Sequence, residues 1–189
     1  MLILISLLIS FALSHQGVEG DEHSFQIRLL SLPTSLLMYA VASLTLLSLT
    51  LNWSAWKLPF RFGSTEKGHV LKPAVFYIVE DVVAVDGAGK REYREAFNAR
   101  YNASPVFRDM IWTLSVVWML WFYVFAVLFT VLVFTLPVEA VYAVGWAGPF
   151  PLAGILAVWT TYYVKGQLRR EKDDGGQVNE RTALLGGQD

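Results

Sequence analysis

The stretch Met110–Leu136, MIWTLSVVWMLWFYVFAVLFTVLVFTL, contains no charged side chain. Two further stretches, Leu29–Leu51 and Ala140–Val164, share this property. Each is longer than the roughly 20 apolar residues that cross a bilayer core as an α-helix. The sequence therefore predicts an all-α membrane protein with three transmembrane helices.

The composition of the whole chain agrees with this class and excludes others. Hydrophobic residues make up 54% of the chain and charged residues 16%, whereas an average soluble domain has about 25% charged residues. The net charge of −1 indicates no nucleic-acid partner. The chain has no cysteine, which excludes disulfides and cysteine-ligated metal sites. No residue cluster indicates catalysis, cofactor binding or metal binding, so the sequence predicts a protein that is not an enzyme.

The first residues, MLILISLLISFALS, are apolar but too short to cross a bilayer. Ala12 and Ser14 are small residues at the −3 and −1 positions of a possible cleavage site before His15. No lysine or arginine precedes the apolar run, as a secretory signal would have. Two interpretations stay open for residues 1–14, a cleaved signal peptide and a short membrane segment.

The distribution of lysine and arginine predicts the orientation of the chain. Of fifteen such residues, nine lie between Lys57 and Arg108, five follow Val164, and one is Arg28. Cytosolic loops retain lysine and arginine because the membrane potential and the anionic inner leaflet oppose their translocation. We therefore expect the N-terminus on the non-cytosolic side and the C-terminus in the cytosol.

These observations divide the chain into eight segments. They are a signal peptide or short membrane segment (1–14), a non-cytosolic segment (15–28), transmembrane helix 1 (29–52), a cytosolic loop (53–109), transmembrane helix 2 (110–136), a non-cytosolic hairpin (137–145), transmembrane helix 3 (146–164) and a disordered cytosolic tail (165–189).

The cytosolic loop contains two predicted amphipathic helices, Pro73–Asp86 and Lys90–Tyr101, which form a helical hairpin. Apolar residues of the first fall on one face at helical spacing and acidic residues on another. The apolar set is Val75, Phe76, Val79, Val82 and Val83, and the polar face carries Glu80 and Asp81. The β-branched content of this segment also permits a strand. We expect the basic residues of the second helix to pair with Glu80, Asp81 and Asp86.

The basic residues of the loop have two interpretations. They form an ordinary positive-inside surface, or they bind anionic lipid headgroups. The candidate lipid contacts are Lys90, Arg91, Arg94, Arg100 and Arg108.

The tail carries one short motif, Glu180-Arg-Thr-Ala-Leu184-Leu185. It resembles the acidic dileucine sorting signals, in which an acidic residue stands before three variable residues and a leucine pair. That resemblance implies a clathrin adaptor as partner and places the protein in the endosomal, vacuolar or lysosomal membrane. The surrounding composition is polar and charged in both signs, which is typical of disordered chain.

A second resemblance lies in the cytosolic loop. Val79-Glu80-Asp81-Val82-Val83-Ala84-Val85-Asp86-Gly87, with Arg100-Tyr101 and Ser104-Pro105 after it, is similar to a segment of uncharacterised multi-pass membrane proteins of filamentous fungi. The resemblance implies no activity.

The sequence leads to one functional prediction and two alternatives. We expect a non-enzymatic accessory or scaffold component of the endosomal or vacuolar membrane, with membrane lipids, a homo-oligomer or another membrane protein as partners. The first alternative is an oligomeric small transporter or channel. The second is an interfacial lipid-modifying enzyme that uses Glu80, Asp81 or His69.

Overall fold

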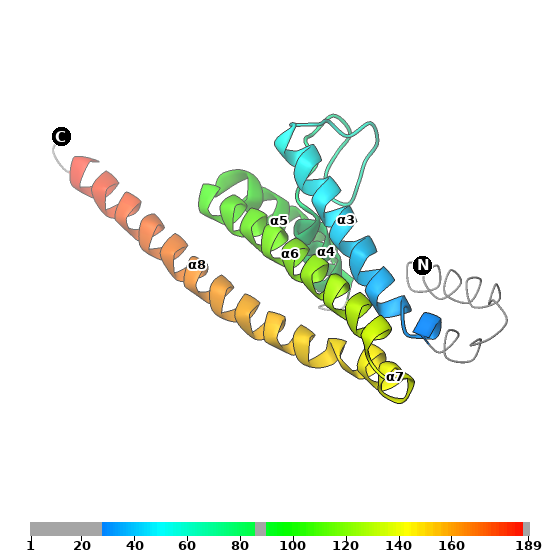
Figure 1. Ribbon diagram of the computed structural model, residues 1–189. Helices are drawn as coiled ribbons and strands as arrows, with labels where there is room; N and C mark the ends of the chain where they lie inside the picture. The colour runs from blue at the N-terminus through cyan, green and yellow to red at the C-terminus, as the bar shows by residue number, and fades with distance from the viewer. Residues whose placement is uncertain (1–27, 86–89, 187–189) are drawn as a thin grey trace.

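The computed structural model describes residues 28–85 and 90–186, and the side chains of its last helix as far as Lys172. The predicted signal or membrane segment at residues 1–14 lies outside the described residues. The described residues form six helices (Figure 1): α3 (Pro33–Trp53), α4 (Ala74–Val85), α5 (Lys90–Ala103), α6 (Pro105–Thr135), α7 (Val138–Ala147) and α8 (Pro149–Gly186).

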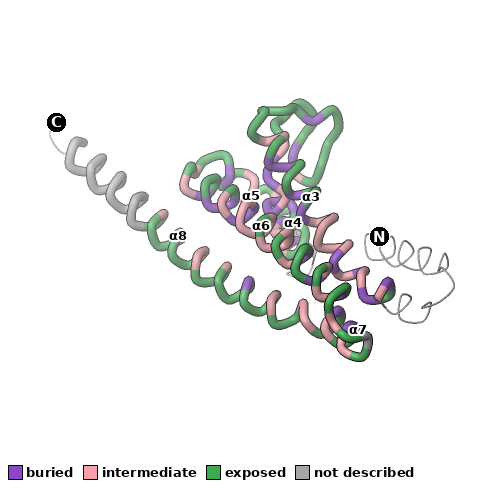
Figure 2. Tube along the Cα trace, in the orientation of Figure 1, coloured by how far each residue is buried: buried purple, intermediate pink, exposed green. Residues whose placement is uncertain are grey.

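Three helices of the described chain are long and apolar enough to cross a membrane, and they confirm the predicted class. These candidate spans are Pro33–Trp53, Pro105–Thr135 and Glu139–Lys172. Helix α3 packs along α6, and α8 diverges from α6 toward the C-terminus (Figure 1). Most of the described surface of α8 is exposed (Figure 2), as expected for a helix whose apolar side chains face lipid.

The start of α6 follows directly from its sequence. The Ser104 hydroxyl accepts a hydrogen bond from the Phe107 amide at 3.2 Å, and Pro105 occupies the first turn. A serine cap and a proline at the first helical position both satisfy a helix N-terminus, since that turn has no internal partners for its N–H groups. The helix therefore begins five residues before the charge-free stretch Met110–Leu136.

Hydroxyl groups inside the spans are used for packing. Ser43 on α3 and Tyr123 on α6 share a hydrogen bond of 3.0 Å. Trp118 Nε1 on α6 donates to Thr160 Oγ1 on α8 at 3.1 Å. Such interhelical bonds fix the register of spans that have no hydrophobic driving force between them. Other hydroxyls, including Ser115 and Thr130, donate to the carbonyl four residues earlier.

The connection between α6 and α8 differs from the sequence prediction. The hairpin predicted at residues 137–145 is the short helix α7, because Pro137 ends α6 and its fixed φ also suits the start of a new helix. Gly148 then allows the chain to turn, since a Cβ there would stand 2.5 Å from Phe129 Cε1. A larger residue here would require the Phe129 ring and the Val144 carbonyl of α7 to shift.

The end of the chain differs as well. Helix α8 continues from Pro149 through Gly186, beyond the third span predicted at 146–164 and into the tail predicted to be disordered. Helical backbone across residues 165–186 therefore replaces the expected disorder. Residues 187–189 lie outside the described part of the chain.

Helices α4 and α5 form as predicted and pack against the first turns of α6. Their shared core is aromatic: Phe76 is fully buried and its ring stacks on Phe97 with centroids 4.8 Å apart. Tyr101 and Phe107 complete this cluster, and Figure 2 shows the buried residues concentrated where α4, α5 and α6 meet. The helical hairpin is thus a small subdomain fixed to the bundle.

The subdomain is also attached to α3. Ser48 Oγ, five residues before the end of that helix, accepts a hydrogen bond from the Ala74 amide at the start of α4 (2.9 Å). Asn52 Nδ2 donates to the Leu71 carbonyl at 2.6 Å. These bonds place the beginning of α4 beside the last turns of a membrane span.

Candidate functional site

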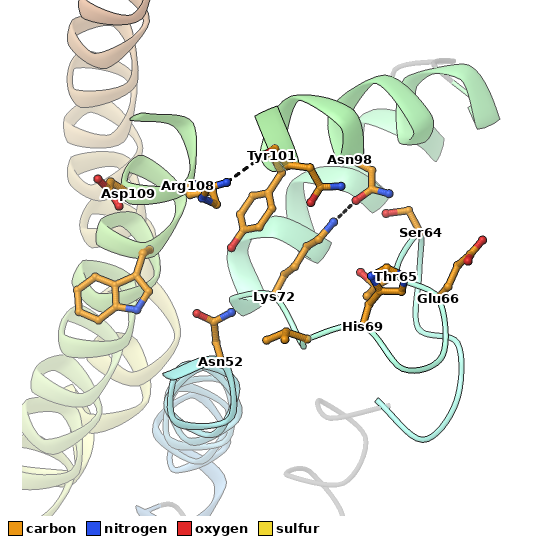
Figure 3. A pocket seen from close by; sticks show the side chains of 13 residues that line it. Asn52, Ser64, Thr65, Glu66, His69, Lys72, Asn98, Tyr101, Arg108 and Asp109 are labelled. Atoms are coloured by element: carbon orange, nitrogen blue, oxygen red, sulfur yellow. Dashed lines mark hydrogen bonds between the residues drawn. The ribbon is translucent and has the colours of Figure 1, made fainter. Parts of the chain in front are cut away.

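A polar pocket of about 630 Å³ lies where the last turn of α3 meets α5, α6 and the loop that precedes α4 (Figure 3). We call it the polar pocket and define it by its lining residues. These are Asn52, Ser64, Thr65, Glu66, His69, Val70, Lys72, Asn98, Tyr101, Asn102, Arg108, Asp109 and Trp112.

Lys72 stands at the centre of the polar pocket and is only 6% exposed. Its Nζ donates to Asn98 Oδ1, and it lies 4.0 Å above the centre of the Phe76 ring and 4.9 Å from that of Tyr101. Burial lowers the pKa of Lys72 to about 8, while the nearby charge of Glu80 acts in the opposite direction. The ammonium is therefore charged near neutral pH but poorly solvated, which favours an anion beside it.

A second cation reaches the polar pocket from α6. Arg108 Nη1 donates to the Asn102 carbonyl at 3.0 Å, which anchors one nitrogen of the guanidinium. A guanidinium has five N–H donors, so this bond leaves donors for a further acceptor. Figure 3 shows the Tyr101 ring between Arg108 and Lys72, with the Lys72 ammonium directed toward Asn98.

The remaining lining groups are polar and include two carboxylates. The amides of Asn52 and Asn98 flank Lys72, whereas Glu66 and Asp109 stand at opposite ends of the pocket (Figure 3). The Ser64 hydroxyl oxygen is buried and has no hydrogen-bond partner in the described chain. A buried hydroxyl without a partner is uncommon in folded proteins and is satisfied when a ligand supplies an acceptor.

A buried carboxylate lies behind the polar pocket. Glu80 is 0% exposed, and neither of its oxygens accepts a hydrogen bond among the described residues. Its nearest cation is Arg94, whose Nη1 lies 3.7 Å from Glu80 Oε1. The polar face that the sequence predicts is thus covered at Glu80, and the expected pairing of this residue with the second helix is made by Arg94. The loop at Gly63, which has φ +57°, passes over the carboxylate and removes it from solvent.

The predicted lipid-binding arginines do not form one surface. Three of them pair with carboxylates: Arg91 with Glu95 at 2.7 Å, Arg94 with Asp81 at 2.9 Å, and Arg100 with Glu171 at 3.4 Å. The pairing of the second helix with Asp81 was expected from the sequence, whereas Asp86 lies outside the described residues. Of the five candidates, Arg108 lines the polar pocket, and the side chain of Lys90 is not described.

The residues proposed for an enzymatic alternative are also separated. His69 lines the polar pocket, Glu80 is buried behind it, and Asp81 lines a different, apolar cavity. No three His, Asp or Glu side chains within residues 28–85 and 90–186 are grouped as metal ligands. The polar pocket combines two cations, Lys72 and Arg108, with two carboxylates, Glu66 and Asp109.

The residues of the tail motif are placed only by their backbone. Glu180, Leu184 and Leu185 all fall on the last turns of α8, and their side chains lie beyond the described ones. The motif itself stays a prediction from sequence.

Comparison with known proteins identifies a family but no activity. A family model described as Domain of unknown function (DUF8766) matches residues 2–174, which is most of the chain. No curated protein and no solved structure matches it. The chain therefore belongs to the DUF8766 family.

Proposed function

We propose that this member of the DUF8766 family is a non-enzymatic integral membrane protein that binds a phosphate-bearing lipid headgroup in the polar pocket. The observation that supports it is the presence of Lys72 and Arg108 in one pocket at the end of a candidate span. Phosphate oxygens are strong acceptors for both an ammonium and a guanidinium, and the guanidinium adds bidentate geometry. An accessory or scaffold protein would use such a site to recognise its membrane.

The depth of the polar pocket supports a lipid rather than a fully dissolved ligand. Asn52 is one residue from the end of α3, and Trp112 lies in the first turn of the charge-free part of α6. Trp and Tyr are enriched where a span enters the headgroup layer. Because both residues line the pocket, its opening lies at the level of lipid phosphates in a bilayer that surrounds α3 and α6.

Binding of a short-chain phosphatidic acid to the purified protein in a neutral detergent tests this proposal. We expect Lys72→Met to weaken binding at least about tenfold, because a hydrogen bond to a charged group contributes about 1.5–3 kcal/mol. Arg108→Gln should have a similar effect. Lys67→Met is the matched control, because Lys67 is exposed on the same loop and does not line the pocket.

One further result identifies whether the phosphate belongs to a lipid or to a soluble anion, and another decides whether the polar pocket is the binding site. Tight binding of glycerol phosphate, which has no acyl chains, would indicate a soluble anion as the ligand. Equal affinity of the parent, Lys72→Met and Arg108→Gln proteins for phosphatidic acid would contradict the site.

We further propose that the protein resides in the endosomal or vacuolar membrane, with its N-terminus non-cytosolic and its C-terminus cytosolic. The support is the basic composition of residues 53–109 and the acidic dileucine-like motif at Glu180, Leu184 and Leu185. In this orientation the motif extends from the end of a span and is accessible to a clathrin adaptor.

Live-cell imaging of a tagged protein tests the sorting motif. We expect Leu184→Ala plus Leu185→Ala to move the protein from vacuole or lysosome to the plasma membrane or Golgi, because the leucine pair supplies the apolar contact with the adaptor. Leu168→Ala, on the same helix but outside the motif, is the control. Identical distributions of the parent and the double variant would show that the leucine pair has no role in sorting.

A further inference from the structure

A second cavity, on the other side of the loop from the polar pocket, has different chemistry. This apolar groove has a volume of about 700 Å³ and lies between α3, the loop that follows it and α4. Its walls include Val41, Leu44 and Leu47 of α3, Trp56 and Phe60 of the loop, and Ile78 of α4. We infer that the apolar groove holds one acyl chain of a phospholipid from the leaflet at the C-terminal end of α3.

The length of the apolar groove matches a single leaflet. It follows α3 from Val41 to Leu51, a distance of about 15 Å at 1.5 Å per residue. The hydrocarbon core of a bilayer is about 30 Å thick, so the groove extends over about half of it. One acyl chain, which extends from the headgroup to the bilayer centre, has this length.

The polar atoms in the apolar groove are already satisfied, so they offer nothing to a polar ligand. Thr45 Oγ1 donates to the Val41 carbonyl at 2.8 Å, and Ser48 Oγ donates to the Thr45 carbonyl at 2.7 Å. Ser48 Oγ also accepts from the Ala74 amide. Asp81, at the edge of the groove, is paired with Arg94. A hydrocarbon chain is the ligand that these surroundings accommodate without loss of a hydrogen bond.

The loop extends the apolar walls beyond the end of the span. Phe60 is 59% exposed and Phe62 is 47% exposed, and both line the groove together with Trp56. These loop residues line the same groove as the α3 residues from Val41 to Leu51. An acyl chain in the groove covers their rings and keeps this apolar area out of water.

Two basic residues belong to the loop that lines the groove. Lys57 and Arg61 alternate with the groove-lining aromatics of the same loop, and both side chains are exposed. Lysine and arginine at the membrane surface contribute attraction to anionic headgroups. An anionic phospholipid therefore satisfies both the groove and its rim.

The lipid in the apolar groove is separate from the ligand of the polar pocket. The two cavities share no lining residue. The wall between them is closed by the hydrogen bond from Tyr77 Oη to Thr65 Oγ1 at 3.1 Å and by that from Asn52 to the Leu71 carbonyl. The inference therefore does not depend on the proposed headgroup site.

Native mass spectrometry of the protein after exchange into neutral detergent with phosphatidylglycerol tests this inference. Every protein in this test carries Lys72→Met, which removes the proposed phosphate contact of the polar pocket. In this background we expect retention of one phosphatidylglycerol, and Leu44→Trp plus Leu47→Trp should reduce the retained fraction at least about tenfold, because the indoles fill the groove. The matched control is Val124→Trp plus Val127→Trp, which places two indoles on exposed positions of α6. The control should retain lipid as the parent does.

Three further results make the test decisive. Ile78→Trp fills the same groove from α4 and should give the same loss if the α3 variant does not fold. Because the proteins compared share the Lys72→Met change, a loss of lipid is assigned to the apolar groove and not to the polar pocket. A parent protein that retains no phospholipid, or folded groove-filled variants that retain it like the parent, would overturn the inference.

Discussion

Replacing Arg94 with alanine is expected to destabilise the subdomain of α4 and α5 by about 3 kcal/mol, because it leaves the buried Glu80 without its nearest cation. Glu80 has no hydrogen-bond partner among the described residues, and the Arg94 guanidinium at 3.7 Å is its closest opposite charge. Lys72 supplies a second attraction, so the loss should fall at the lower end of the range for broken buried pairs. The thermal unfolding midpoint in detergent and hydrogen exchange of the α4 and α5 amides measure this effect.

The control for this prediction lies on the same helix. Arg91 forms an ion pair with Glu95 at 2.7 Å, but the two side chains are 90% and 64% exposed. Exposed pairs contribute about 0–1 kcal/mol, so Arg91→Ala should leave the unfolding midpoint nearly unchanged. Adding Glu80→Gln to Arg94→Ala should recover part of the loss, since it removes the buried charge. Equal losses from Arg94→Ala and Arg91→Ala would contradict the role assigned to Arg94.

The membrane spans could be predicted from the sequence because their signal does not depend on neighbouring elements. A charge-free stretch longer than a bilayer core has few other structures available. The ends of the spans depend on a few neighbouring residues, and Ser104-Pro105 predicted the start of α6 correctly. Helix α7 was missed because a short apolar segment after a proline is equally compatible with a turn.

The orientation of α4 could be predicted only in part. Val75 and Phe76 are buried, as their spacing indicated, whereas Val82 is 52% exposed and Glu80 is fully buried. Helical periodicity identifies which residues share a face, but it does not identify which faces are covered. The loop at Gly63 and the second helix cover Glu80 from outside its own helix.

The polar pocket was beyond prediction for a related reason. Its residues come from the end of α3, the loop before α4, α5 and α6, and only the packing of α5 and α6 against the loop brings them together. Lys72 in particular reads in the sequence as one of nine basic loop residues. The sequence signal that points to Lys72 is its neighbour Pro73, which directly precedes α4. The side chain of Lys72 therefore lies at the start of that helix, against the Phe76 ring of the aromatic core.

The second large effect expected is a rise in stability with pH that depends on Lys72. The unfolded chain keeps the Lys72 proton up to about pH 10.5, whereas the folded protein releases it near pH 8 because the side chain is buried. Between these values the unfolded state binds more protons, so the free energy of unfolding increases with pH. The full pKa difference of Lys72 between the unfolded and folded states corresponds to about 3 kcal/mol in the free energy of unfolding.

Comparison of the parent with Lys72→Met from about pH 7 to about pH 9.5 isolates this contribution, because the other groups titrate in both proteins. Burial raises the pKa of Tyr93 and of Tyr101, so these phenols lower stability only at still higher pH. The parent's unfolding midpoint should approach that of Lys72→Met as pH rises. Over the same range the parent should lose affinity for phosphatidic acid, since a neutral amine no longer attracts the phosphate. A parent whose stability and affinity are both constant across this range would show that Lys72 keeps its proton in the folded protein, and the polar pocket would then bind anions independently of pH.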